Sequence, residues 1–290
     1  MRGGRYRPMY VHSLKAGLDG SGRLVAWRNR IVGQSILANS PFAQALVKNG
    51  IDVTSVEGAA TIPYAIPNLR VELTTTEVGI PVLWWRAVGS THTAYAVEAF
   101  IDEVAEAAGK DPVAFRLDLL EDHPRHAGVL KLAAEKAGWD RPLPKGRFRG
   151  VAVAESFKTY VANVAEVTVS DNGQPKVERI VCAIDCGVAV NPDIIEAQVE
   201  GSVGFALSSV LRNQITLRNG VVEQSNFDDY NPTRFSEMPK VEVHIVKSLE
   251  APTGIGEPAV PPLAPAIGNA IAAATGKRLY SLPFDAKLLG

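Results

Sequence analysis

The sequence predicts an α+β fold, in which β-hairpins and helices are interleaved. Two turns rich in Asp, Asn and Gly, at residues 19–22 and 171–173, each lie between runs that carry apolar residues, a pattern typical of β-hairpins. Apolar residues at helical spacing predict helices over residues 91–108, 194–210 and 265–274. Strands and helices do not alternate regularly, which favours α+β over a parallel α/β sheet.

The composition is that of an ordinary globular chain. It has 290 residues, of which 46% are hydrophobic and 21% charged, and its formal net charge is -1. A charge so close to neutral gives no support for a nucleic-acid partner or an acidic membrane surface. No run of 18 apolar residues occurs, so we predict no membrane span. The first residues are basic, but no apolar segment follows them, so they do not form a complete export signal.

The first half of the chain begins with the hairpin of residues 14–18 and 23–27. Residues 38–60 are less regular, and an extended run follows at 69–76. In the helix at 91–108, Thr91 or Thr93 can cap the start and Gly109 suits the end. The apolar face of this helix is formed by Val97, Phe100, Ile101, Val104 and Ala108. The charged face, which is expected to point to solvent, is formed by Glu98, Asp102, Glu103 and Glu106.

Asp111 and Pro112 open a second helix over 113–120, because Asp caps helices and Pro fits their first turn. A third helix is expected over 128–137, and residues 142–146 form a linker. Beyond it we expect strands at 162–169, 176–184 and 240–246, a β pair around 218–220, and the helices already named, the last one ended by Gly276. The linker divides the chain into two α+β subdomains, residues 1–145 and 146–290.

Two motifs have structural explanations that outweigh functional ones. Cys182 and Cys186 lie four residues apart in a predicted strand, about 13 Å at about 3.3 Å per residue, which is too far for a disulfide or a shared metal. We expect them to be packed core thiols. A proline separates His123 from His126, which argues against a helical pair of zinc ligands, so we expect this segment to be a solvated loop.

Two further motifs leave both kinds of explanation open. Arg86 follows two tryptophans and precedes a helix, which brings together a guanidinium, a stacking surface and backbone N–H groups suited to an anion or a heterocycle. Packing of the arginine on a tryptophan explains the pattern equally well. Glu257 is the one carboxylate between Gly254 and Phe284. It is either a local cap or a general base whose partial desolvation makes it more effective.

Taken together, these segments resemble the molybdenum hydroxylases, the xanthine dehydrogenase and aldehyde oxidase family. The similar segments are GIGEPAVPPLAPAIGNAIAAATGKR, WWRAVGSTHTAYAVEAFIDEVAEAAGKDPVAFRLDLL and CAIDCGVAVNPDIIEAQVEGSVGFAL, in the family order. Four shorter segments are most similar in sequence to the large subunit of bacterial isoquinoline 1-oxidoreductases, namely WWRAVGS, DCGVAVNPD, EQSNFDDYN and EMPKVEVHIV. The resemblance covers nearly the whole chain and implies the molybdopterin-binding fold of this family.

The resemblance also implies a reaction and residues for it. It implies hydroxylation of an N-heterocycle or an aldehyde with water as the oxygen source, with Glu257 as the base and Arg86 stabilising developing charge. Gln198 would contact the pterin, and Gly89, Ser90 and Gly256 would let backbone amides approach it. The cofactor is molybdenum–molybdopterin, in bacteria usually the cytosine dinucleotide form, and no residue of this chain is expected to ligate the metal.

The family's large subunits are more than twice as long as this chain, and their amino-terminal part closes the other side of the site. We therefore expect the chain to supply roughly half of a site. The partners implied are that missing amino-terminal half, a small iron–sulfur subunit that takes the electrons, and a small-molecule heterocycle or aldehyde. The alternative is a truncated, non-catalytic chain with a scaffold or assembly role. We expect a cytoplasmic location, or a periplasmic one where a complete subunit carries an export signal.

Overall fold

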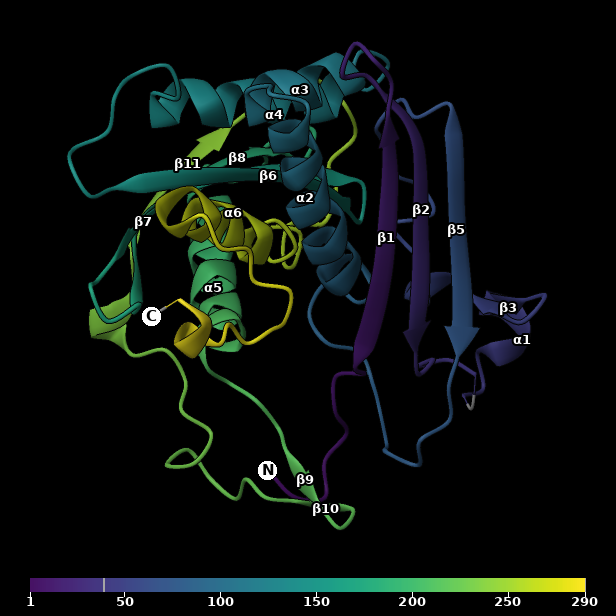
Figure 1. The fold of residues 1–290 in the computed structure, drawn as a ribbon. Helices are drawn as coiled ribbons and strands as arrows, with labels where there is room; N and C mark the ends of the chain where they lie inside the picture. The colour runs from purple at the N-terminus through teal and green to yellow at the C-terminus, as the bar shows by residue number, and fades with distance from the viewer. Residues whose placement is uncertain (39, 290) are drawn as a thin grey trace.

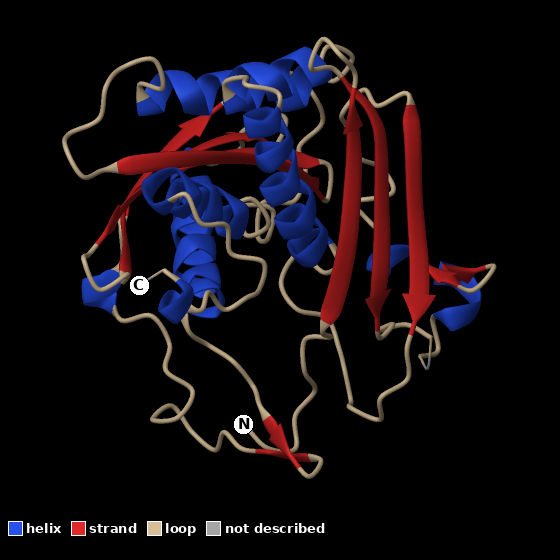
Figure 2. Cartoon of the chain, in the orientation of Figure 1, coloured by secondary structure: helices blue, strands red, loops and turns tan. Residues whose placement is uncertain are grey.

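The computed structural model describes residues 1–38 and 40–289, which form two main β-sheets and the helices packed between and beside them (Figures 1 and 2). The smaller sheet has three strands in the order β1-β2-β5. Strands β1 (Tyr10–Leu18) and β2 (Leu24–Gly33) form the predicted antiparallel hairpin, and β5 (Asn68–Thr75) pairs with β2 in parallel. The hairpin turn is closed by Asp19, whose carboxylate accepts hydrogen bonds from the backbone of Ser21 and Arg23.

The larger sheet has four strands in the order β11-β8-β7-β6. Strands β6 (Phe148–Ser156), β7 (Thr159–Val169) and β8 (Pro175–Asp185) form an antiparallel meander. Strand β11 (Lys240–Ile245) joins β8 in parallel, after a crossover through helix α5 (Pro192–Leu211). The sequence did not predict β6. The described residues also include two short hairpins, β3 (Val47–Lys48) with β4 (Ile51–Asp52) and β9 (Leu217–Arg218) with β10 (Val221–Val222).

The remaining helices are α1 (Ala43–Leu46), α2 (Ser90–Ala107), α3 (Pro112–Leu119), α4 (Pro124–Ala137) and α6 (Leu263–Thr275). Figure 1 shows α2 running between the two sheets. Asp111 caps α3 as predicted, accepting from the amides of Val113 and Ala114 at 2.9 Å each. Gly276 ends α6 in the left-handed conformation, also as predicted.

Helices cover both faces of the larger sheet. Apolar residues of α4, such as Leu130, pack with Val151 and Val153 of β6, and this core extends through α2 to Trp27 of the smaller sheet. Residues of α6, such as Ile267, pack with Ala152 on the opposite face of β6. Because side chains alternate along a strand, β6 is buried from both sides. The subdomain boundary predicted after residue 145 falls in the loop between α4 and β6, and that division stays a prediction.

The two cysteines are buried and free, which confirms that they are core thiols. The solvated loop predicted at residues 123–126 is wrong, because Pro124 opens α4 and His126 is buried in its first turn against the ring of Tyr160. By length and composition alone, α5 could cross a membrane, although 44% of its most apolar 18-residue window is buried. Core helices of globular proteins pass the same test.

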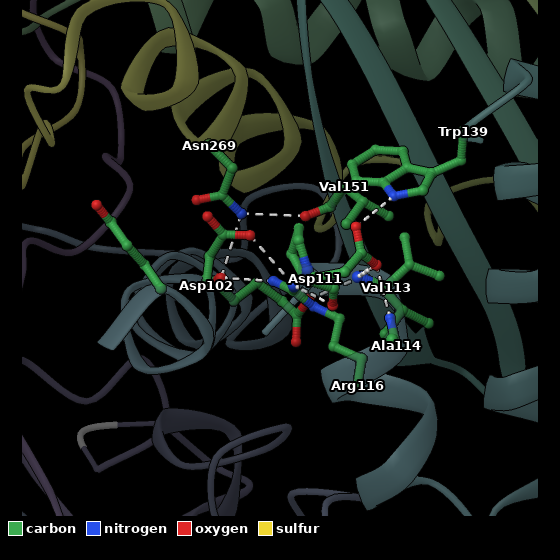
Figure 3. Close-up of polar contacts among 12 residues, drawn as sticks. Asp102, Asp111, Val113, Ala114, Arg116, Trp139, Val151 and Asn269 are labelled. Carbon is green, nitrogen blue, oxygen red and sulfur yellow. Dashed lines mark hydrogen bonds and ion pairs between the residues drawn. The ribbon is translucent and has the colours of Figure 1, made fainter. Parts of the chain in front are cut away.

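A buried polar network joins α2 and α3 to the larger sheet. Glu98, predicted to face solvent, is 2% exposed, and its carboxylate accepts from Arg116 Nε at 2.9 Å and from the amide of Val153 at 3.0 Å. Tyr64 donates to the same carboxylate at 2.6 Å. Figure 3 shows Arg116 reaching Asp102 as well. Glu98 is therefore a paired core residue, which is the condition under which a buried charge is tolerated.

Candidate active site

Arg86 lies in an unusual turn directly before α2. The two residues that follow it, Ala87 and Val88, have φ angles of 65° and 48°. Positive φ is rare for a β-branched residue and is strained, so the surroundings must hold this turn in place. Thr91 Oγ1 donates to the carbonyl of Arg86 at 2.7 Å, and the amide of Val88 donates to the carbonyl of Trp85 at 2.8 Å. The turn fixes the direction in which the Arg86 side chain leaves the backbone.

The guanidinium of Arg86 brings together the loop before α6 and helix α5. Its Nε donates to the carbonyl of Gly256 at 2.9 Å, and its Nη2 donates to the same oxygen. Nη2 also donates to Gln198 Oε1 at 3.4 Å, while the contact of Nη1 with the carbonyl of Gly201 is long, at 3.5 Å. Gly256 lies 170 residues from Arg86 in the sequence. Arg86, Gln198 and Gly256, which were predicted as site residues, thus lie together.

Glu257 adjoins this cluster through its neighbour Gly256. It is half-buried, and its carboxylate has no hydrogen bond or ion pair with any other residue in 1–38 or 40–289. It is not a local cap, because Pro262 occupies the N-cap position of α6 and no side chain caps that helix. The carboxylate is therefore available to a group outside the described chain.

The backbone around Glu257 leaves open space. A Cβ atom added at Gly256 would meet only Gln198 Oε1, at 3.9 Å, and one added at Gly201 would meet nothing within 4 Å. The amide nitrogen of Gln198 makes no hydrogen bond within the described part of the chain. Packing within this chain therefore does not require glycine at positions 201 and 256. Close approach of a ligand to the backbone would require it, because a side chain would block the ligand. The site thus offers a guanidinium, a carboxamide, a carboxylate and backbone that no side chain covers. These hydrogen-bond donors and acceptors suit a pterin-type heterocycle with anionic groups.

The backbone amides of Gly89 and Ser90, which were expected to be free for the cofactor, are already hydrogen-bonded within the chain. Glu57 Oε1 accepts from the amide of Gly89 at 2.6 Å and from that of Ser90 at 3.1 Å, so this carboxyl caps the start of α2. The predicted caps are wrong, since Thr91 and Thr93 bond to backbone carbonyls instead. Burial raises the pKa of Glu57 from 4.5 to about 7, although these amide bonds act in the opposite direction. A cofactor contact at Gly89 and Ser90 would have to displace Glu57, and it stays a prediction.

Aromatic side chains connect Arg86 to a second cation. Arg86 lies over the ring of Phe205 with its Cζ 5.4 Å from the ring centroid, and Phe205 lies 4.8 Å from the ring of Trp85. Arg7 stacks on Trp85 at 4.3 Å. Glu57, Phe205 and Arg7 are not among the residues that the sequence motifs indicate. No local signal identifies them, because each lies far along the chain from the segment that it contacts.

Two family models with the description "Molybdopterin cofactor-binding domain" match this chain, over residues 1–119 and 123–239. The chain is 34% identical over 226 residues to the beta subunit of isoquinoline 1-oxidoreductase from Brevundimonas diminuta, which covers 77% of this chain and 29% of that protein. It is 34% identical over 244 residues to a nicotinate dehydrogenase subunit of Pseudomonas putida, covering 78% of this chain and 20% of that protein.

The fold matches solved structures over most of its length. The crystal structure of quinoline 2-oxidoreductase from Pseudomonas putida 86 superposes with a TM-score of 0.76 at 13% identity, over 95% of this chain and 60% of that chain. The chain spans less than a third of the length of the isoquinoline and nicotinate relatives, at 29% and 20%. The family models, the relatives and the fold agree with the resemblance drawn from the motifs, and the chain belongs to the molybdenum hydroxylase family, of which it forms molybdopterin cofactor-binding domains.

Proposed function

We propose that this chain is the part of a molybdenum hydroxylase that holds one side of the molybdopterin cofactor and carries the catalytic base. The observation that supports this most is the meeting of Arg86, Gln198 and Gly256 from three distant segments, with the unpartnered carboxylate of Glu257 beside them in the described chain. The reaction is the hydroxylation of an N-heterocycle or an aldehyde, in which water supplies the oxygen and two electrons and two protons leave.

The bound cofactor supplies the two-electron redox chemistry. Gln198 would hold the pterin through its free amide nitrogen, and Gly256 would allow the backbone to come close to it. Glu257 would take up a proton from the reacting water, since its carboxylate has no competing partner in the described chain. The guanidinium of Arg86 would orient an oxygen that gains negative charge, while its bonds to Gly256 keep the loop of Glu257 in position.

The cofactor form and the partners of this chain are proposed from its resemblance to the family. We infer the cytosine dinucleotide form of the cofactor, a small iron–sulfur subunit as electron acceptor, and a second polypeptide segment that completes the pocket. The isoquinoline and nicotinate relatives are, by their names, subunits and thus parts of larger enzymes. A chain that spans a small fraction of their length would then need the remaining segment for turnover.

The test is reconstitution of the chain with that remaining segment and the iron–sulfur subunit, followed by a dye-reduction assay with a heterocycle or an aldehyde. Glu257→Gln should abolish turnover, because the amide cannot accept the proton, while the cofactor content stays unchanged. Glu250→Gln is the matched control, since Glu250 is an exposed acid earlier in the same loop region. Full activity of Glu257→Gln would rule out the assigned base.

The alternative, a non-catalytic chain with a scaffold role, makes a different prediction for the purified protein. Stoichiometric molybdenum and a nucleotide tail, measured on the chain with its partners, would argue against it. Arg86→Lys sharpens this measurement, because lysine keeps the charge but cannot make two bonds to the Gly256 carbonyl. If Arg86 only packs on Phe205, the variant should retain cofactor and activity.

A further inference from the structure

Arg7 is a charged residue without a charged partner in the described chain. It lies half-buried in the segment before β1, and its guanidinium end sits deep enough for burial to lower its pKa to about 10. Its ring contact is the stacking on Trp85 at 4.3 Å, and within residues 1–38 and 40–289 it makes no hydrogen bond and no ion pair. A guanidinium has five N–H donors, and one that is removed from water is normally paired.

The guanidinium lines a small cavity that has a second unpartnered polar atom. The cavity has a volume of about 20 Å³, and its walls include Arg7, His92, Trp84, Trp85, Leu83 and Val88. His92 Nε2 is buried and has no hydrogen-bond partner in the described chain. The two hydroxyl groups in the wall are already bonded: that of Tyr10 contacts Ser55 Oγ at 2.8 Å, and that of Thr54 donates to Asp52 Oδ1 at 2.6 Å. Arg7 and His92 are therefore the atoms that a ligand would satisfy.

His92 can offer an N–H to this cavity. Its Nδ1 lies 2.9 Å from His12 Nε2, and His12 Nδ1 lies 3.2 Å from Asn29 Oδ1. The amide nitrogen of Asn29 is buried without a partner in the described chain. Turning the Asn29 amide over would let its nitrogen donate to His12, and both imidazoles would then pass their N–H groups toward the cavity. The neutral state of both rings fits this arrangement, since burial lowers the pKa of His12 to about 4 and holds that of His92 well below its usual value.

The walls indicate which anion would fit. A volume of about 20 Å³ is somewhat more than one water molecule needs and far less than an aromatic ring fills, so only a small charged head group could reach Arg7 and His92 from the mouth of the cavity. Next to the cavity, Trp84 is 49% exposed and forms a ring pair with Phe42 at 6.3 Å. A ring attached to the carboxylate would lie on this aromatic surface, which is typical of sites with one charged group among apolar walls.

We propose that this cavity binds the carboxylate of a small aromatic acid, with Arg7 as the cation, His92 as the second donor and Trp84 as the stacking surface. The cavity wall includes Gly89, one of the predicted cofactor contacts, but its cation differs from that of the Arg86 cluster: Arg7 stacks on Trp85, whereas Arg86 lies over Phe205. The inference does not depend on the proposed function, because it concerns binding and not turnover.

The test uses the full chain and follows tryptophan fluorescence during titration with benzoate, with benzamide as the neutral compound of the same shape. We expect saturable benzoate binding with a Kd on the order of 1 mM, and at least tenfold weaker binding of benzamide, which lacks the charge. Equal binding of the two compounds, or no saturable binding of benzoate, would overturn the proposal.

Variants then locate the site. Arg7→Gln should weaken benzoate binding at least tenfold, and His92→Phe should weaken it several-fold. Arg5→Gln, a change at an exposed arginine two residues away, should leave the affinity unchanged. An unchanged affinity in Arg7→Gln would contradict the assignment. Should Arg7→Gln fail to fold, the comparison of benzoate with benzamide on the unmodified chain still decides the question.

Discussion

Replacing Glu57 with glutamine tests how the start of α2 is stabilised. The carboxyl of half-buried Glu57 lies against the amides of Gly89 and Ser90, and its pKa rises from 4.5 to about 7. The fold therefore favours the protonated acid. Stability from this group is fully present below pH 4.5 and is lost as the pH rises through about 7. The difference between 4.5 and about 7 corresponds to about 3 kcal/mol in the free energy of unfolding.

A glutamine at position 57 resembles the protonated acid and can still accept from both amides. We expect the free energy of unfolding of Glu57→Gln, relative to the natural chain, to rise by about 2.5 kcal/mol between about pH 5 and about pH 8, because part of the full effect lies below pH 5. Urea unfolding at the two pH values measures this difference. Buried histidines also change stability in this range, but they are common to both proteins and cancel.

The matched control is Glu77→Gln, at an exposed glutamate, for which the difference should stay the same at both pH values. If Glu57→Gln also shows no change with pH, the carboxyl is ionised in the fold at little cost. The explanation of the α2 start given above would then be wrong.

Glu98→Ala, and the pair Gly150→Ala and Gly128→Ala, test the packing of the core. Glu98→Ala leaves the fully buried guanidinium of Arg116 without its main partner, so urea unfolding should show a loss of about 3–5 kcal/mol, and a loss below about 1 kcal/mol would contradict the buried pair. Gly150→Ala places a Cβ 2.2 Å from the backbone nitrogen of Ala270, so β6 and α6 must separate and stability should fall by about 1–3 kcal/mol. Gly128→Ala in α4 meets nothing within 4 Å and should instead stabilise the chain by about 0.5–1 kcal/mol. Equal effects of Gly150→Ala and Gly128→Ala would refute the close strand–helix contact.

Local signals in the sequence predicted most helices, hairpins and their ends. The cap at Asp111 and the stop at Gly276 succeeded because each depends on residues within one turn of the helix. Strand β6 was missed because Val151 and its small neighbours do not alternate with polar residues. Both faces of the strand are buried, so no alternation is required.

The failures share a physical cause, which is that the deciding partner lies far away along the chain. Glu98 has a helical position that favours solvent, but Arg116 and Val153 neutralise and bury it. The start of α2 is capped by Glu57, 32 residues before Gly89, and not by a nearby threonine. For the candidate site, the motifs indicated Arg86, Gln198, Gly256 and Glu257, yet only the fold shows which of them touch.

The position of Glu98 also has a consequence for how the chain reaches its folded state. Besides the bond from Arg116, its carboxylate accepts bonds from Tyr64, 34 residues earlier in the chain, and from Val153, 55 residues later. Until these segments assemble around α2, the ionised group keeps its water shell and opposes closure of the core. Partly assembled chains are therefore less stable than the complete fold. The segment synthesised before β6 should stay unfolded and sensitive to proteases until β6 has been synthesised and has packed against α2.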